Sequence, residues 1–366
     1  MSLKLFLVTL FISGSLGNPF WSRPQYQTDD YYTYEEIQEY LKGLAGSYGN
    51  RVKLTDIGKT HQDRNLTTIT ISNGDGRRGK NVIFIDAGIH GREWITHTSA
   101  LNIIDQLVVN FEANKELLKD YDWVILPLVN ADGYTYSRSG KVFTDEAINC
   151  GALNSKDHDI KCWRKNLRPR RNGCVGTDIN RNFGYAWGKG DSSPYSCSIT
   201  YKGPYKFSEP ESQALQKVLL DLVSSRRGIL YLTLHSALAE ILYPWSSKRI
   251  NAKNYKEHKE VAQAGVDAIR NAKLKSSSNY KVLPAHKLYL TGGSTSDYAY
   301  KIGFPLSLIW ELPAKRGNLK FEFHPPTKLI KELVDETWIA MRAMAKKVIQ
   351  KYPNRKKSIG LVKNKL

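Results

Sequence analysis

Three apolar runs of the chain each lead into a histidine or a carboxylate. These are Val82–Ala87 before His90 and Glu93, Gly228–Leu234 before His235, and Phe304–Trp310 before Glu311. Uninterrupted apolar runs of this length are typical of strands in a parallel sheet, because helices cover both of its faces. Open sheets of this kind bind ligands at the carboxyl edge of their strands. We therefore predict that the four polar side chains meet in one site.

Helical and strand-like segments alternate along most of the chain. Helical spacing is found at Tyr34–Ser47, Trp94–Val109, Glu209–Val223, Tyr255–Asn271 and Thr327–Ile349. Strand-like runs are Val52–Ile57, Leu66–Ile71, Val82–Ala87, Trp123–Val129, Gly228–Leu234 and Phe304–Trp310. The first helix also has a capping box, Thr33-Tyr34-Glu35-Glu36. This order predicts a single α/β domain, with a mixed, largely parallel central sheet and helices on both faces.

The stretch from Ala131 to Lys206 lacks a clear period and contains all four cysteines, Cys150, Cys162, Cys174 and Cys197. A long irregular stretch in a compact domain usually carries functional residues or is held in place by cross-links such as disulfides. An even count in a secreted chain suggests two disulfides, for which sequence alone allows three connectivities. Local pairing, Cys150–Cys162 and Cys174–Cys197, would close two loops. Zinc binding by all four is the alternative, but the spacings contain no C-x-x-C pair.

The first 17 residues are typical of a secretory signal. Lys4 is followed by the apolar stretch Leu5–Ile12 and by the small-residue pattern Ser15-Leu16-Gly17. A membrane anchor is the alternative, but this run is too short to span a bilayer, and no later segment could span one. We expect an extracellular protein that is not bound to a membrane. Asn65-Leu66-Thr67 is then a glycosylation sequon, usable if the segment is exposed.

The chain is strongly basic, with 54 Lys and Arg against 35 Asp and Glu and a net charge of +19. Two interpretations of this charge are equally supported: a solvated surface that keeps the protein soluble, and a surface that attracts an acidic polysaccharide. Nucleic acid is not an expected partner, because the aromatic residues do not interleave with the basic clusters and the chain carries a secretory signal.

His90, Glu93 and His235 together have the composition of a catalytic zinc site, which takes three protein ligands and leaves one position for water. Asp178 is a candidate for orienting one histidine through its other ring nitrogen. An H-x-x-E spacing alone is weak support, because it occurs by chance and a strand-end histidine can simply be packed.

Further motifs in the same order make the chain similar to the zinc carboxypeptidases of the A/B type. They are Gly88-Ile89-His90-Gly91-Arg92-Glu93-Trp94, Asn130-Ala131-Asp132-Gly133-Tyr134, Trp163-Arg164-Lys165, Asp178-Ile179-Asn180-Arg181-Asn182-Phe183, Leu234-His235-Ser236, Leu242-Tyr243-Pro244 and Trp310-Glu311-Leu312. The resemblance runs from about Tyr31 to Lys351. It divides the chain into a signal peptide (1–17), a short N-terminal segment (18–30), a catalytic domain (31–351) and a basic tail (352–366).

The resemblance implies a role for each matching residue. His90, Glu93 and His235 would bind one zinc ion, and Glu311 would be the general base. Arg164 would stabilise the oxyanion. The substrate's terminal carboxylate would be held by Asn180, Arg181 and Tyr289, with Arg92 acting further along the peptide. The expected partners are peptides or proteins with a free C-terminus, and the expected oligomeric state is a monomer.

The expected C-terminal preference is for neutral, apolar or aromatic residues. The branch of the family that is specific for basic residues usually has an acid at the base of the side-chain pocket. The matching position here is Ser296, or Thr295 in a shifted alignment. Leu242, Ser246, Leu288 and Ile309 are the other expected pocket positions. A buried lysine or arginine needs a countercharge, and none is evident in the sequence, although a modest loop shift could bring Asp297 inward.

Two alternatives remain open. The chain could be an inactive member that binds polyanions through its basic surface, or a B-type enzyme that releases C-terminal Lys or Arg. Zinc carboxypeptidases of the A/B type commonly carry an inhibitory pro-domain, yet here the similarity to their catalytic domain begins soon after the signal segment. We therefore expect an enzyme that is secreted in active form.

Overall fold

A computed structural model describes residues 26–139, 160–274, 277–316, 319–321 and 323–354. The predicted signal peptide, Cys150 and most of the predicted basic tail lie outside the described residues. Within the described part, the helices are all too short or too polar to cross a membrane.

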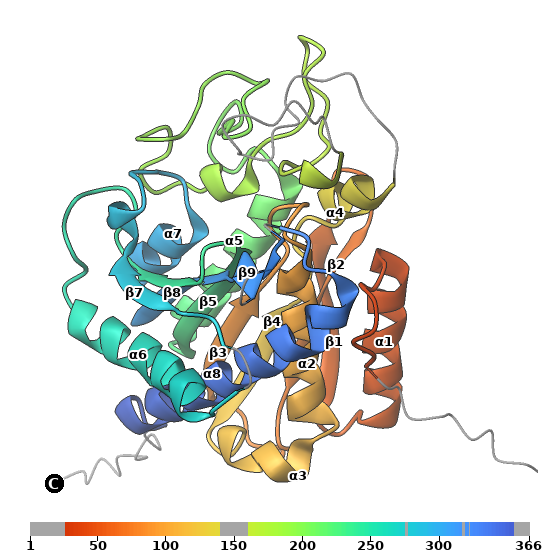
Figure 1. The fold of residues 1–366 in the computed structure, drawn as a ribbon, viewed down its shortest axis with the longest axis vertical. Coiled ribbons are helices and arrows are strands. Elements are labelled where there is room, and N and C mark those ends of the chain that lie inside the picture. Colours follow the sequence, from red (N-terminus) through yellow and green to blue (C-terminus); the bar gives the residue numbers. More distant parts are fainter. Residues whose placement is uncertain (1–25, 140–159, 275–276, 317–318, 322, 355–366) are drawn as a thin grey trace, which may run out of the picture.

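An eight-stranded sheet forms the centre of the molecule (Figure 1). In spatial order its strands are β1 (Val52–Lys59), β2 (Asn65–Ile71), β4 (Tyr121–Leu126), β3 (Asn81–Asp86), β5 (Gly228–Ser236), β8 (Leu306–Leu312), β6 (Glu240–Tyr243) and β7 (Lys281–Pro284). The central strands β4, β3, β5 and β8 are parallel. The outer pairs β1–β2, β2–β4 and β6–β8 are antiparallel. The predicted α/β fold with a mixed, largely parallel sheet is confirmed.

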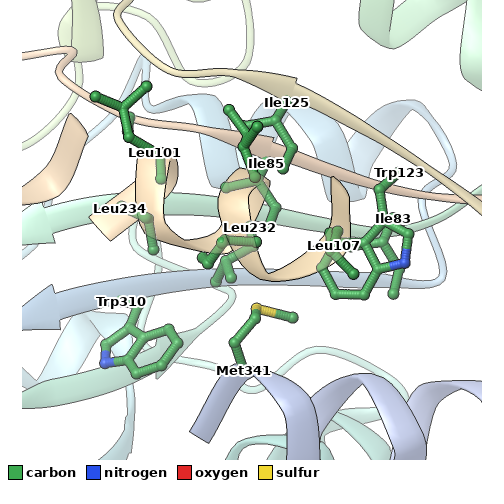
Figure 2. Close-up of a cluster of buried hydrophobic side chains, with 14 of the residues drawn as sticks. Ile83, Ile85, Leu101, Leu107, Trp123, Ile125, Leu232, Leu234, Trp310 and Met341 are labelled. Atoms are coloured by element: carbon green, nitrogen blue, oxygen red, sulfur yellow. The ribbon is translucent and has the colours of Figure 1, made fainter. Parts of the chain in front are cut away.

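Helices cover both faces of this sheet. The helices of the described residues are α1 (Tyr34–Ser47), α2 (Trp94–Val108), α3 (Phe111–Asn114), α4 (Ala131–Arg138), α5 (Pro210–Ser224), α6 (Tyr255–Asn271), α7 (Thr295–Ile302) and α8 (Ile330–Lys351). The short α3 packs against α2, and α4 lies beside the loop around Cys162. Ile83 and Ile85 of β3 belong to the core beneath α2 and α8 (Figure 2), whereas Val82 and Phe84 belong to the core beneath α5 and α7. Alternate residues of a strand point to opposite faces, so a strand covered on both sides is apolar throughout.

All five predicted helices are present, and the capping box gives α1 its predicted bounds. The sequence pattern does not indicate β6 and β7, which have four residues each, or α4 and α7, which have eight each. Segments this short contain too few periods for a pattern to be visible. The stretch predicted to be irregular from Ala131 thus begins with a helix, α4. Asn130 caps this helix by accepting a hydrogen bond from the backbone N–H of Gly133.

Candidate metal centre

His90, Glu93 and His235 converge at the carboxyl edge of the sheet. His90 follows β3, Glu93 precedes α2, and His235 lies near the end of β5, so the parallel strands bring the three together. The Glu93 carboxylate lies between the two imidazoles, with Oε1 2.6 Å from His90 Nδ1 and Oε2 3.1 Å from His235 Nδ1. All three side chains are buried, and one candidate ligand atom of each lies within 4.8 Å of the others.

This donor set fits a zinc ion. Two imidazole nitrogens and one carboxylate are a ligand set of catalytic zinc sites. Burial alone would raise the pKa of the Glu93 carboxyl, but His90 and His235 outweigh it and hold the pKa below its usual range. Glu93 is therefore ionised, as a metal ligand must be. The predicted ligands thus lie together in a form suited to a divalent cation.

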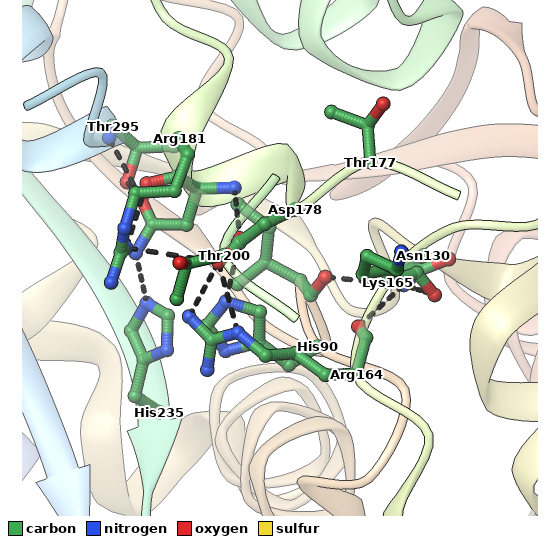
Figure 3. Close-up of polar contacts among 12 residues, drawn as sticks. His90, Asn130, Arg164, Lys165, Thr177, Asp178, Arg181, Thr200, His235 and Thr295 are labelled. Atoms are coloured by element: carbon green, nitrogen blue, oxygen red, sulfur yellow. Dashed lines mark hydrogen bonds and ion pairs between the residues drawn. The ribbon is translucent and has the colours of Figure 1, made fainter. Parts of the chain in front are cut away.

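Asp178 connects this centre to Arg164. Its Oδ1 lies 3.2 Å from His90 Nε2, and its Oδ2 accepts a hydrogen bond from Arg164 Nε at 2.9 Å (Figure 3). Oδ1 also accepts from the backbone N–H of Asn180 at 2.9 Å. A carboxylate can only accept, so Asp178 is placed to accept a proton from His90 Nε2, and that tautomer would leave Nδ1, the nitrogen beside Glu93, for a metal ion. The predicted contact of Asp178 with a histidine is present, and its contact with Arg164 is an additional finding.

Glu311 lies beside the three candidate ligands on the neighbouring strand β8, where it is the register partner of His235. Desolvation by burial raises the pKa of Glu311 to about 7, against the opposing effect of His235. Arg164 approaches the same centre, with Nη1 3.9 Å from Glu93 Oε1. A carboxyl group with a pKa near neutrality can both accept and return a proton at physiological pH.

Four of the predicted substrate-binding residues, Arg92, Asn180, Arg181 and Tyr289, line the same cavity, which has a volume of about 380 Å³. Arg181 is anchored by the backbone oxygen of Asp191 at 3.0 Å, and its guanidinium lies 5.7 Å from the centre of the Tyr289 ring. Asn180 lines the cavity too, while Tyr289 is 44% exposed at its rim. Arg92 stacks on the ring of Phe323 at 4.1 Å. Two buried arginines and an amide thus face one cavity beside the candidate ligands.

Ser296 does not line this cavity, contrary to the sequence-based expectation. Its backbone oxygen and hydroxyl accept hydrogen bonds from Ser307 Oγ at 2.8 and 3.2 Å, so the side chain is directed toward β8. The hydroxyl-bearing residues that do line it are Ser236, Ser246, Tyr289, Thr291 and Ser294. Leu242, Leu288 and Ile309 line the cavity as expected, together with Ala285. Ser294 directly follows the glycine pair Gly292-Gly293, and this position in the sequence is a signal that could have indicated its place in the cavity.

A disulfide holds the loops next to the cavity. Cys174 is bonded to Cys197, as local pairing predicts. Cys162 is also disulfide-bonded, and its predicted partner Cys150 lies outside the described residues. The Cys174–Cys197 bond spans a segment that contains Asp178, Asn180 and Arg181, so it restrains the loop that carries these side chains.

Comparison with known proteins identifies the class. Residues 37–340 match the family model described as zinc carboxypeptidase. The chain is 34% identical to carboxypeptidase B of Helicoverpa zea over 85% of this chain and 68% of the relative. It is 32% identical to carboxypeptidase O of Bos taurus over 89% and 81%, respectively. The crystal structure of carboxypeptidase A from Helicoverpa armigera superposes with a TM-score of 0.79 and 30% identity, covering 90% of this chain and 76% of that one.

The chain therefore belongs to the zinc carboxypeptidase family. It is a peptide hydrolase, and the similar proteins include both A-type and B-type carboxypeptidases.

Proposed function

We propose that this chain is a secreted carboxypeptidase that removes neutral, apolar or aromatic residues from the C-terminus of peptides. The observation that carries the proposal is the composition of the cavity beside the candidate zinc ligands. Its inner wall is formed by Leu242, Ala285, Leu288 and Ile309. Among the described residues that line it, the carboxylates are Glu93 and Glu311, both at the metal end. A C-terminal lysine or arginine would be buried there without a countercharge of its own.

Asp297, the acidic residue closest in sequence to the expected pocket position, is already engaged. Its carboxylate accepts hydrogen bonds from the backbone N–H groups of Ser246 and Ser247 at 2.8 and 2.9 Å, and from Ser247 Oγ at 2.7 Å. Asp297 is not among the residues that line the cavity. These contacts hold the chain around Ser246 in place, and support a structural role for Asp297.

In the proposed reaction, Arg181 and Asn180 hold the substrate's terminal carboxylate, with Tyr289 closing over it. A guanidinium group recognises a carboxylate through two parallel hydrogen bonds, so Arg181 measures the end of the chain. Arg92 contacts the peptide further from its end. This division of roles rests on the three arginines that line one cavity, of which Arg164 lies at the metal end.

His90, Glu93 and His235 would hold the zinc ion. When bound, zinc supplies a Lewis acid and makes an associated water molecule more acidic. Glu311 would take a proton from the attacking water and return it to the leaving amine, and a pKa near neutrality suits both transfers. Arg164, held by Asp178, donates hydrogen bonds to the oxygen on which negative charge develops.

The test compares peptides that differ only in their C-terminal residue, Phe, Leu, Lys or Arg, with and without a zinc chelator. We expect the highest kcat/KM for Phe or Leu, and loss of hydrolysis with the chelator. Fastest release of Lys or Arg would instead assign the enzyme to the B type. Absence of hydrolysis by the zinc-loaded protein would favour a binding protein.

Secretion is supported by the N-terminal pattern and by the cysteines, because the described ones are all disulfide-bonded. Binding of an acidic polysaccharide and the monomeric state stay predictions. The first rests on net charge alone.

A further inference from the structure

A line of polar side chains runs behind His235, away from the cavity. Tyr231, Thr233 and His235 are alternate residues of β5, so they lie on one face of the strand. Asp86, at the end of β3, is the register partner of Thr233. Tyr231, Thr233 and Asp86 have no exposed surface, and His235 has 2%. Buried polar groups in such a line are expected to satisfy one another.

The hydrogen bonds of this line have a defined direction. Asp86 Oδ1 accepts from Thr233 Oγ1 at 2.8 Å, and Asp86 Oδ2 accepts from the Tyr231 hydroxyl. Thr233 Oγ1 also lies 3.3 Å from His235 Nε2. A threonine hydroxyl has one proton, and here it goes to the carboxylate, which can only accept. Thr233 Oγ1 is then left with lone pairs toward His235, so its contact with Nε2 is a hydrogen bond when Nε2 carries a proton.

We propose that Thr233, anchored by Asp86, is a positioning residue that keeps the proton of His235 on Nε2 and its Nδ1 free to bind zinc. This inference rests on the proposed metal-binding role of His90, Glu93 and His235. It adds to Asp178, which acts on His90 alone. Each imidazole then has its own acceptor behind it, directly for His90 and through a hydroxyl for His235. Such partners fix both the tautomer and the orientation of a metal-bound histidine.

The same proton position leaves Asn180 available for substrate. Asn180 Nδ2 lies 3.4 Å from His235 Nε2. The amide cannot be turned over, because Asn180 Oδ1 accepts from the backbone N–H of Thr295 at 2.9 Å. With Nε2 protonated, both groups are donors and do not bond to each other. The N–H groups of Asn180 therefore remain free for an acceptor in the cavity, such as a carboxylate.

The test measures zinc affinity by competition with a chromogenic chelator. Thr233→Val keeps the shape and removes the hydroxyl, and Thr233→Ser restores the hydroxyl. We expect T233V to bind zinc about 10- to 100-fold more weakly, and T233S to bind it like the wild type. Thr68→Val is the matched control, because Thr68 is also a buried strand threonine, bonded to the backbone oxygen of Thr55 on the β1–β2 pair. T68V should not change zinc affinity.

Unchanged zinc affinity in folded T233V would overturn the inference. If T233V does not fold, the zinc-loaded wild type decides the question by long-range proton–nitrogen NMR of His235. A proton on Nε2 is expected, and one on Nδ1 overturns the inference. If the wild type hydrolyses peptides and T233V keeps its zinc affinity, the role of Thr233 is refuted and the proposed function stands. A wild-type protein that binds no zinc would remove the proposed function first.

Discussion

Glu93 and Glu311 are neighbouring buried carboxylates whose pKa values are shifted in opposite directions. Desolvation acts on both, but Glu93 lies between two imidazoles that hold its pKa below the usual range. Glu311 has a weaker interaction with His235, so burial dominates and raises its pKa to about 7. Two carboxyl groups with pKa values that differ in this way are suited to different tasks. One is suited to hold a cation permanently, the other to exchange a proton.

Replacing Glu311 by glutamine is expected to abolish turnover without releasing zinc. The amide has the same shape but cannot accept the proton from water, so kcat should fall by about 10²- to 10⁴-fold. Zinc content should remain at one per chain, because Glu311 is not among the three converging residues. Steady-state kinetics and metal analysis of the same preparation measure both. A variant that retains wild-type kcat would contradict the role of Glu311 as the base.

A carboxylate placed in the cavity should change the C-terminal preference. Thr291 lines the cavity and is 6% exposed, and its backbone N–H donates to the backbone oxygen of Ser246 at 3.0 Å. Thr291→Asp adds a negative charge there, and Thr291→Asn is the neutral control of matched size. We expect T291D to raise the kcat/KM for C-terminal Lys relative to Leu by about tenfold or more, because a charge pair shielded from water contributes at least about 1.4 kcal/mol. T291N should leave this ratio unchanged. Equal ratios in the two variants would show that Thr291 does not face the substrate's side chain.

At the scale of elements, α6 is fixed to β8 through a neutral histidine. His258 Nδ1 lies 3.2 Å from the backbone oxygen of Asn254, and its Nε2 accepts from the backbone N–H of Ser307 at 3.1 Å. Burial lowers the pKa of His258 to about 4. A proton on Nε2 would remove the acceptor for Ser307, which lies on the same strand as Glu311. The docking of α6 on β8 thus requires the neutral ring.

Stability should therefore depend on pH through His258. Between about pH 4 and 6.5 the unfolded chain binds this proton and the native chain does not, so the free energy of unfolding rises with pH. The contribution of His258 to it reaches its full value above about pH 6.5. At pH 5 the expected loss is about 2 kcal/mol. Urea unfolding at pH 5 and 7.5 of the wild type and His258→Gln measures it. The wild type should lose more stability than H258Q, and equal losses would contradict this prediction.

How far sequence predicts these elements depends on their burial and length. β3, β5 and β8 were predictable because both of their faces are covered, which leaves long apolar runs. The residues of the cavity wall near α7 were not fully predictable from the sequence, because their placement depends on the turn before α7. Gly293 has φ +73°, and a side chain there would lie 2.1 Å from the backbone oxygen of Arg181. Ser294, which lines the cavity, directly follows Gly293, whereas Ser296 lies within α7 and does not line it. Residue spacing alone does not encode this difference.

At the scale of the whole molecule, the order of the strands assembles the site. β3, β5 and β8 are adjacent and parallel, although β8 follows β5 in the chain by about seventy residues. Their carboxyl ends carry His90, His235 and Glu311, so the groups of the proposed reaction are attached to rigid elements. The three candidate ligands come from two separate parts of the chain, which makes a bound metal a cross-link between β3 and β5.

Removing zinc should therefore lower thermal stability as well as activity. A ligand that binds only the native state stabilises it by RT ln(1 + [L]/Kd), about 2.7 kcal/mol when free zinc is about 100 times Kd. The metal-free protein should remain folded, because Glu93 still contacts both imidazoles. Thermal unfolding with and without a chelator should give a lower Tm for the metal-free protein, reversed by added zinc. His235→Ala is the control, because its Tm should not respond to either reagent. A wild-type Tm that is unaffected by chelation, in a protein shown to have lost its zinc, would mean that the metal does not hold β3 and β5 together.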